Sequence, residues 1–180
     1  MKVENRYSPN FGAKLIIDKV YVKKLANLGF IQQNTNFVKL VNWNKNDILA
    51  LNEIAKWKND EYAKLIQHHV SEGYAADVYV LTTQQNDFSI IDAKKILGVV
   101  QITENHVLGG FLDYFQVKPS LKNMGIGHSI LNSLKMLYNK ISLVPAGKKE
   151  VKQFYLRNGF VEYPDDSNFF VWYKDSFERF

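Results

Sequence analysis

The chain has 180 residues, of which 46% are hydrophobic and 14% aromatic, so we expect one domain over residues 1–180 with a full apolar core. No apolar run approaches the ~20 residues of a membrane span, and the first residues lack the apolar stretch of a signal peptide. We therefore expect a cytoplasmic protein with no membrane partner. The chain has no cysteine, which excludes disulfides, thiolate metal sites and a cysteine nucleophile.

The formal net charge is +5, and the lysines that produce it are spread along the chain. Pairs occur at 23–24, 94–95 and 148–149, but there is no long basic block. This distribution argues against nucleic acid as a partner. A polyanionic ligand would account for Lys118, Lys122 and the pair at 148–149, although each of these could equally be a solvated surface lysine.

The first third of the chain gives few clear signals. Residues 14–28 could form an amphipathic helix, but their middle would also suit a strand. Residues 37–43 alternate like a first strand, and Asn44 or Asn46 can cap a helix after it. A second helix is expected from Asp60.

The rest of the chain alternates between strand-like and helix-like patterns. Aromatic and β-branched runs predict strands, and apolar residues at helical spacing predict two more helices. The predicted strands cover residues 78–83, 96–103, 111–117, 141–144, 160–163 and 169–173, the predicted helices cover 125–138 and 149–158, and polar connections are expected at 84–87 and 104–110. Helices, then strands, then alternation predict an α/β or α+β fold with a mixed sheet.

The stretch Gly125-Ile126-Gly127 lies at the predicted turn from strand to helix. Two glycines there leave backbone N–H groups uncovered at the positive end of the helix dipole, so the turn could hold an anion. The glycines could also simply relieve crowding against a neighbouring strand. The dinucleotide-binding fingerprint is excluded because Ile130 replaces its third glycine, and the nucleotide P-loop because His128 follows the last glycine.

Two motifs carry a family resemblance. Residues 122–127 (Lys-Asn-Met-Gly-Ile-Gly) resemble the Gln/Arg-x-x-Gly-x-Gly/Ala signature of the GCN5-related N-acetyltransferases, the GNAT family, and Val117-x-Pro119 precedes them as it often does in that family. Residues 154–160 (Phe-Tyr-Leu-Arg-Asn-Gly-Phe) are similar to the family's Phe-Tyr-x-x-x-Gly-Phe segment. The resemblance covers roughly residues 78–173 and leaves 1–35 as an unmatched extension.

The resemblance implies both a fold and an activity. The fold would be a central, mostly antiparallel sheet that is splayed at the cofactor site and flanked by helices. The activity would be direct transfer of an acetyl group from acetyl-CoA, the co-substrate, to a primary amine, with no metal. A non-catalytic GNAT-fold module that binds acyl-CoA or a protein partner stays an alternative, as does an unrelated α/β domain with an ordinary glycine turn.

The resemblance also implies where the cofactor would bind. The backbone N–H groups of Phe115 and Val117 would hold the pantetheine arm and the thioester carbonyl, so their side chains can be apolar. The turn would hold the pyrophosphate through its amides, and the cofactor-binding residues expected in and beside it are Lys122, Asn123, Met124, Gly125, Ile126, Gly127 and His128. Lys122 stands where Gln or Arg is usual, and Lys148 stands where many members carry an Asn.

Two residues are candidates for the chemistry. Tyr155 occupies the position of the family's tyrosine, which protonates the departing thiolate; the phenol is protonated at neutral pH, but the ring could also be only a packed core aromatic. Asp113 is the candidate base, because simple alternation places it on one strand face with Phe111, Phe115 and Val117, where aromatic neighbours could raise its pKa. It could equally be a structural acid.

The remaining polar residues give no further site. Glu104 and His106 are expected in a turn, and the adjacent His68 and His69 cannot share a helix face as metal ligands. The acceptor would be a small-molecule or peptide amine, and the lack of an acidic cluster argues mildly against polycationic amines. Whether the protein forms a homodimer stays open.

Overall fold

The computed structural model describes residues 15–16, 35–40, 57, 76–89, 91–105 and 107–174. The helices expected after Asn44 or Asn46 and from Asp60 lie outside these ranges, as do most of residues 14–28. At the start of the 14–28 segment, where a helix was one of the two expectations, the structure has no helix in its described residues. Leu15–Ile16 form a short strand, β1, which pairs with the next strand and so satisfies its backbone groups in the sheet.

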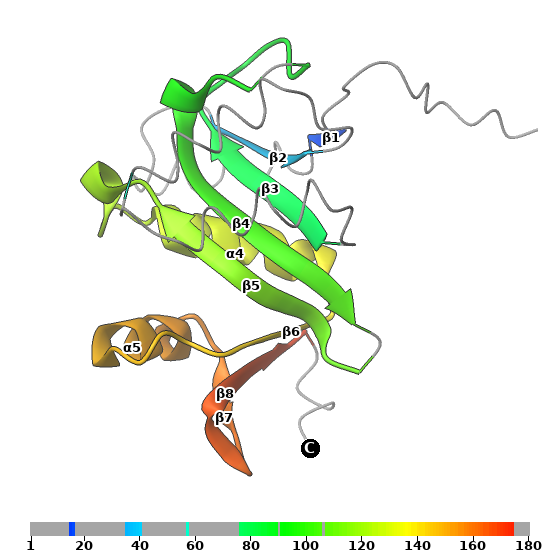
Figure 1. The fold of residues 1–180 in the computed structure, drawn as a ribbon, viewed down its shortest axis with the longest axis vertical. Coiled ribbons are helices and arrows are strands. Elements are labelled where there is room, and N and C mark those ends of the chain that lie inside the picture. Colours follow the sequence, from blue (N-terminus) through cyan, green and yellow to red (C-terminus); the bar gives the residue numbers. More distant parts are fainter. Residues whose placement is uncertain are drawn as a thin grey trace, which may run out of the picture.

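The described strands form one eight-stranded sheet in the order β1-β2-β3-β4-β5-β6-β8-β7 (Figure 1). The strands after β1 are β2 (Asn36–Leu40), β3 (Ala76–Thr82), β4 (Ile96–Asn105), β5 (Gly109–Val117), β6 (Lys140–Leu143), β7 (Val161–Tyr163) and β8 (Asp166–Tyr173). All neighbours are antiparallel except β5 and β6, which are parallel. The expected mixed, mostly antiparallel sheet is therefore confirmed.

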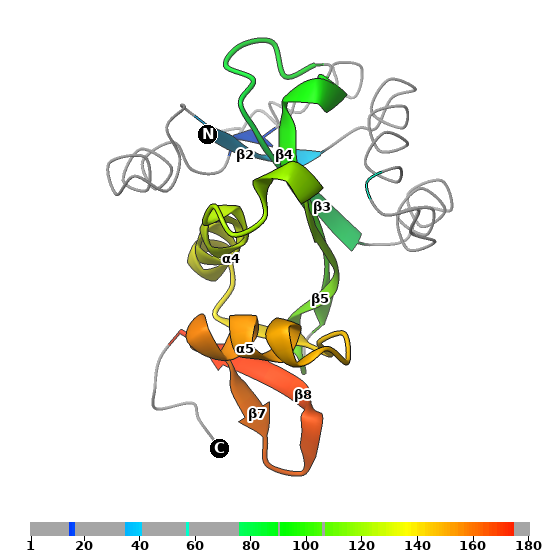
Figure 2. The same cartoon turned by 90° about the vertical axis from the view of Figure 1, so that its left-hand side faces the viewer.

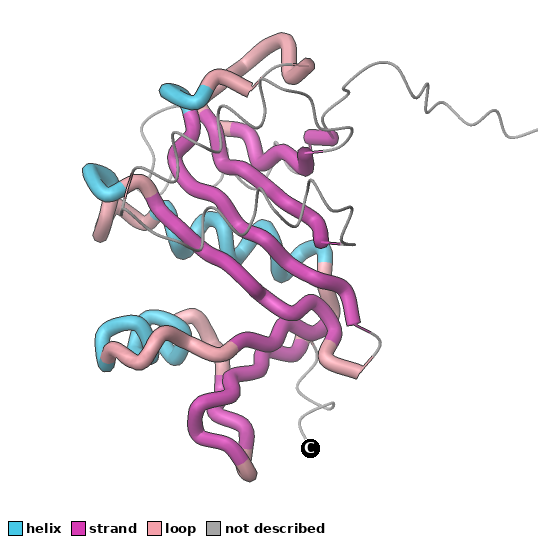
Figure 3. The backbone as a smooth tube through the Cα atoms, viewed as in Figure 1, coloured by secondary structure: helices cyan, strands magenta, loops and turns pink. Residues whose placement is uncertain are grey.

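The two predicted C-terminal helices are present as α4 (Ile126–Leu137) and α5 (Lys149–Arg157). Figure 3 shows how they alternate with strands in the second half of the chain. Two short 3₁₀ helices were not expected: η1 (Ala93–Lys95), and η2 (Pro119–Leu121), which begins at a proline. The connection between β4 and β5 is shorter than the predicted 104–110, because Glu104 and Gly110 still pair within the sheet.

The sheet has a core on each face. On one face α4 lies across the strands (Figure 2), and its buried apolar residues, which recur at helical spacing, are Ile126, Ile130, Leu131 and Leu134. Tyr155 from α5 belongs to the same cluster. A second cluster on the opposite face contains Val78, Val80, Val99 and Tyr114. We call these the α4 face and the opposite face.

β5 and β6 stay together only at one end. Their pairing is restricted to Gly110 with Ile141 and Phe111 with Ser142. Beyond Phe111 the edge of β5 turned towards β6 has no strand partner among the described residues, and the two strands diverge (Figure 1). The loop after β5 leads into α4 and the loop after β6 leads into α5, so both helices begin at the wide end of the splay.

A β-bulge interrupts the pairing of β4 with β5. Gln101 is opposite Tyr114 and Ile102 is opposite Leu112, so Asp113 is an extra residue in β5. Leu112 packs in the cluster of the α4 face, and so do Phe115 and Val117, although strict alternation would separate them from it. The predicted shared face of Asp113, Phe115 and Val117 is therefore wrong, because a bulge reverses the alternation.

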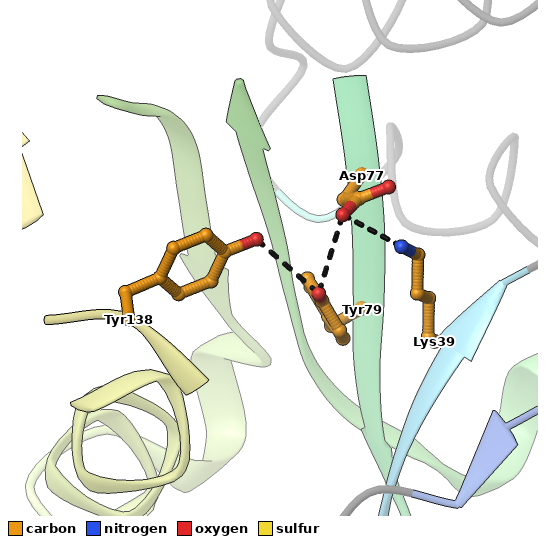
Figure 4. A network of polar contacts seen from close by, with 4 residues as sticks. All are labelled: Lys39, Asp77, Tyr79 and Tyr138. Carbon is orange, nitrogen blue, oxygen red and sulfur yellow. Dashed lines mark hydrogen bonds and ion pairs between the residues drawn. The ribbon is translucent and has the colours of Figure 1, made fainter. Parts of the chain in front are cut away.

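A polar network ties the end of α4 to the sheet (Figure 4). The hydroxyl of Tyr138, directly after α4, lies 3.3 Å from that of Tyr79 on β3. Tyr79 donates to Asp77 over 3.4 Å, and Lys39 on β2 forms an ion pair with the same carboxylate at 2.7 Å. Burial is the main cause that raises the pKa of both phenols, that of Tyr138 to about 12.

The described residues include neither a membrane-spanning helix nor a metal site. None of the described helices combines the length and the apolar character required to cross a membrane. Within the described ranges, no group of three or more His, Asp or Glu side chains is placed to hold a metal.

Candidate active site

The turn before α4 is held in an unusual backbone conformation. Asn123 and Gly125 have φ angles of 63° and 80°, in the left-handed region that glycine adopts without strain. Gly125 is the N-cap residue and offers no side-chain cap, and the first helical hydrogen bond runs from Ser129 N–H to Gly125 O over 3.0 Å. The amides of Ile126 and Gly127 therefore have no acceptor within the helix, which leaves a concave group of donors suited to an anion.

Gly127 has a packing role in addition. A Cβ at this position would lie 3.0 Å from the ring of Phe154 and 3.5 Å from that of Phe115. These two rings stack with their centroids 6.0 Å apart, and so join α5 to β5 next to the turn. Relief of crowding, one of the two interpretations left open by the sequence, thus accounts for Gly127, whereas the left-handed φ accounts for Gly125.

The free edge of β5 faces the splay. Lys118 N–H donates to Leu97 O on the β4 side over 2.9 Å. Because successive N–H groups of a strand point to opposite edges, those of Phe115 and Val117 point away from β4 and towards the gap that opens between β5 and β6. The structure thus brings these two amides and the glycine turn to the same opening.

Apolar and basic side chains flank this opening. Met124, in the turn, is 53% exposed, and Val144, directly after β6, is 58% exposed. The lysines on the two sides are Lys118 and Lys122 after β5 and Lys148 and Lys149 at the start of α5, and all but the half-buried Lys118 are exposed. A ligand that carries both an apolar arm and phosphates has complementary surroundings here.

Tyr155 is buried in an aromatic cluster on α5. Its side chain is 6% exposed and makes edge-to-face contacts with Phe154 and Phe160, with centroids 5.1 and 5.5 Å away. Burial raises the pKa of the phenol, which is therefore protonated at neutral pH. Its hydroxyl makes no hydrogen bond to another described residue, so its proton is available to a ligand.

Asp113 lies at the bulge in β5, on the opposite face. Its side chain is exposed, and Thr103 on β4 donates a hydrogen bond of 2.6 Å to its carboxylate. The ring of Phe111 is on this face too. A Cβ on the preceding residue, Gly110, would point to Tyr138 on the α4 face, and neighbouring residues of a strand point to opposite faces. Asp113 and Tyr155 are thus on different faces of the sheet, with the splay between them.

His128 makes side-chain contacts that the sequence did not predict. Asn158, at the end of α5, donates from Nδ2 to Phe154 O over 2.8 Å, which turns its Oδ1 to His128 Nδ1. Asn132 Nδ2 lies 2.8 Å from His128 Nε2, so both ring nitrogens have a side-chain neighbour. These bonds link the glycine turn to the helix that carries Tyr155. The only sequence signal for them was that Asn158 lies within the second motif.

Comparison with known proteins supports the fold. No family model matches the chain, and no curated protein matches its sequence. Among solved structures, a protein from Exiguobacterium sp. 255-15 assigned as an acetyltransferase matches with a TM-score of 0.57 at 14% identity, covering 81% of this chain and 97% of that one. An acetyltransferase of the GNAT family from Staphylococcus aureus Mu50 matches with a TM-score of 0.50 at 16% identity, over 78% and 99% of the two chains.

A spermidine N-acetyltransferase from Vibrio cholerae has the same architecture. Its TM-score is 0.52 at 16% identity, with 81% of this chain and 96% of that one covered. At such identities the likeness concerns the fold. The GNAT-like fold implied by the two sequence motifs is therefore confirmed.

Proposed function

We propose that this protein, which has the fold of the GNAT acetyltransferases, is an acetyl-CoA-dependent N-acetyltransferase that acts on a primary amine. The proposal depends on one observation, that two structural features lie side by side. A turn with a left-handed Gly125 and amides unpaired within the helix lies beside the splay between β5 and β6. A diphosphate fits the first feature and an extended pantetheine arm fits the second.

The residues around the splay fit coenzyme A as a substrate. The amides of the turn from Met124 to His128 would hold the pyrophosphate, and Lys122 and Asn123 lie in the same turn. The N–H groups of Phe115 and Val117 would bind the arm and the thioester carbonyl. Exposed apolar side chains at the opening would be covered by the arm, and the lysines on both sides would offset the phosphate charges.

The chemistry assigns one role to each face. The amine nitrogen attacks the thioester carbonyl, the carbon–sulfur bond breaks, and the amine loses a proton. Tyr155 would donate its phenolic proton to the departing thiolate, since its hydroxyl is unpaired within the described structure and protonated. Asp113 would accept the proton of the amine, directly or through water, and the phenol would then be reprotonated from solvent.

One observation favours the non-catalytic alternative, a GNAT-fold module that binds acyl-CoA. Tyr155 is almost fully buried, and Asp113, the candidate base, lies on the opposite face of the sheet. In such a module the same opening would bind coenzyme A, and the buried phenol would only pack.

Two measurements test the proposal. Acetyl-CoA at 100 times its dissociation constant should stabilise the fold by about 2.7 kcal/mol and raise the melting temperature accordingly. Release of CoA should then require an added amine. Stabilisation without amine-dependent release would support the binding module, and no stabilisation at any concentration would refute both.

A further inference from the structure

We infer that the acceptor is a primary amine attached by a short chain to an aromatic ring, held against Phe111, Phe169 and Tyr163. The inference rests on the proposed function, because it names the acceptor class of the same site. We call these three rings the aromatic wall.

The described elements leave one face from which an amine can approach. On the α4 face the core is filled by α4 and by residues of α5, including Tyr155 and Phe154. A thioester in the splay is screened by these elements on that side. We therefore place the approach of the amine on the opposite face, where the described residues include the exposed Asp113.

The aromatic wall is on that opposite face. The rings of Phe111 on β5 and Phe169 on β8 stack with centroids 6.4 Å apart and planes 22° apart. Tyr163 on β7 meets Phe169 edge to face at 5.8 Å. Phe170, the neighbour of Phe169, packs in the α4-face cluster, which confirms that Phe169 points the other way.

The wall is neither buried nor fully solvated. Phe111 and Phe169 are half-buried, and Tyr163 is 37% exposed. Beneath the two phenylalanines β6 contributes Ser142, which is fully buried and donates to Leu108 O over 2.9 Å. A flat apolar group can cover the exposed ring surface, and ring contacts of this kind add to the gain from burial.

The charge and the spacing of the residues beside the aromatic wall also suit such an amine. Asp113 follows Phe111 by two residues on the same face, a separation of roughly 7 Å along a strand. A carboxylate at that distance from a ring suits an ammonium group linked to an aromatic group by a short chain. Asp113 is the carboxylate beside Phe111; Asp166, the cross-strand partner of Tyr163, accepts a hydrogen bond from Asn168 N–H over 2.9 Å.

The experiment compares three amines in a CoA-release assay with the full chain: 2-phenylethylamine, n-butylamine and spermidine. We expect kcat/KM for 2-phenylethylamine to exceed that for n-butylamine by about 3- to 10-fold, the size of one aromatic contact. Phe169→Leu should abolish this preference without changing KM for acetyl-CoA. Tyr163→Leu, at a position that is 37% exposed, should reduce the preference in part.

The control is Phe88→Leu, the same exchange at a half-buried phenylalanine that packs against the opposite-face cluster far along the sheet, and it should leave the preference intact. A preference for spermidine, or an aryl preference that survives both wall variants, would overturn the inference while leaving the acetyltransferase proposal standing. If no amine releases CoA, calorimetric titration of 2-phenylethylamine and n-butylamine into the protein–CoA complex decides, because equal or absent binding of the two refutes the wall.

Discussion

Tyr155 combines a buried ring with a hydroxyl that is unpaired in the described structure, and these two properties predict different effects of one substitution on activity and on stability. Tyr155→Phe removes the proton donor and should lower kcat by about 10²-fold, at the low end for general acids. It should leave the free energy of unfolding nearly unchanged, because the ring stays in place and no hydrogen bond to a described residue is lost. Thermal melts and steady-state kinetics on the same preparation measure both effects.

The matched control is Tyr173→Phe, a half-buried tyrosine whose ring lies against the ammonium group of Lys140 at 5.3 Å. It should leave kcat unchanged. Unaltered turnover in Tyr155→Phe would remove this residue as the acid, and a lowered melting temperature would show that the hydroxyl is bonded in solution.

Substitution of Asp113 tests the proposed acceptor of the proton from the amine. Asp113→Asn keeps the shape of the side chain and its contact with Thr103 but cannot accept a proton. If Asp113 is the base, kcat/KM should fall by about 10²-fold and the rise of activity with pH that a carboxylate produces should disappear. A loss confined to KM for the amine would instead assign Asp113 to substrate binding, and an unchanged profile of rate against pH would exclude it as the base.

At the scale of the element, the start of α4 depends on two glycines for different reasons. Gly127→Ala places a Cβ 3.0 Å from Phe154 and should destabilise the fold by about 1–3 kcal/mol, the usual cost of overpacking. Phe154→Leu in the same chain should recover part of that loss, because the ring that clashes is removed. Urea titration of the two single variants and the double variant gives the coupling free energy, and strictly additive losses would contradict the contact.

Gly125→Ala should behave differently. The cost arises from a φ of 80° and is about 1–2 kcal/mol whatever the neighbours are, so Phe154→Leu should not relieve it. If the turn holds a diphosphate, any shift of its backbone to a negative φ should also weaken CoA binding more than Gly127→Ala does. Equal dissociation constants for CoA in the two variants would count against the turn as the phosphate site.

The junction of α4 with β3 predicts how stability depends on pH. The pKa of Tyr138 is raised from its ordinary value of 10.0 to about 12, and that of Tyr79 is raised too, mainly by burial. A folded-state pKa above the unfolded one gives a stabilisation that is complete below pH 10 and is lost as the pH rises towards 12. Tyr138→Phe should make the fall in melting temperature over this range shallower, and an unchanged slope would contradict the buried network.

For the whole molecule, the sequence predicted what depends on repeated patterns. Both C-terminal helices were predicted to within a residue at each end, because α4 buries an apolar stripe that recurs along it. The sequence could not predict the bulge at Asp113. An extra residue in a strand leaves the alternation of residue types intact but reverses the faces to which the following side chains point. The network of Tyr79 and Tyr138 was equally invisible, because its partners are 59 residues apart.

The charge distribution gives a last prediction at the scale of the whole chain. If the lysines at the opening bind phosphates, KM for acetyl-CoA should rise by roughly 3- to 10-fold between low salt and about 0.5 M salt, because screening shortens the range of these interactions. Replacing Lys148 and Lys149 by Gln should raise KM at low salt and flatten this dependence. The control pair is Lys94 and Lys95 in η1, which is exposed like the first pair but lies before β4. Replacement of this control pair lowers the net charge by the same amount. An equal effect of both pairs would mean that the overall charge attracts the cofactor. An effect of the 148–149 pair alone would place the phosphates of the cofactor at the opening between β5 and β6.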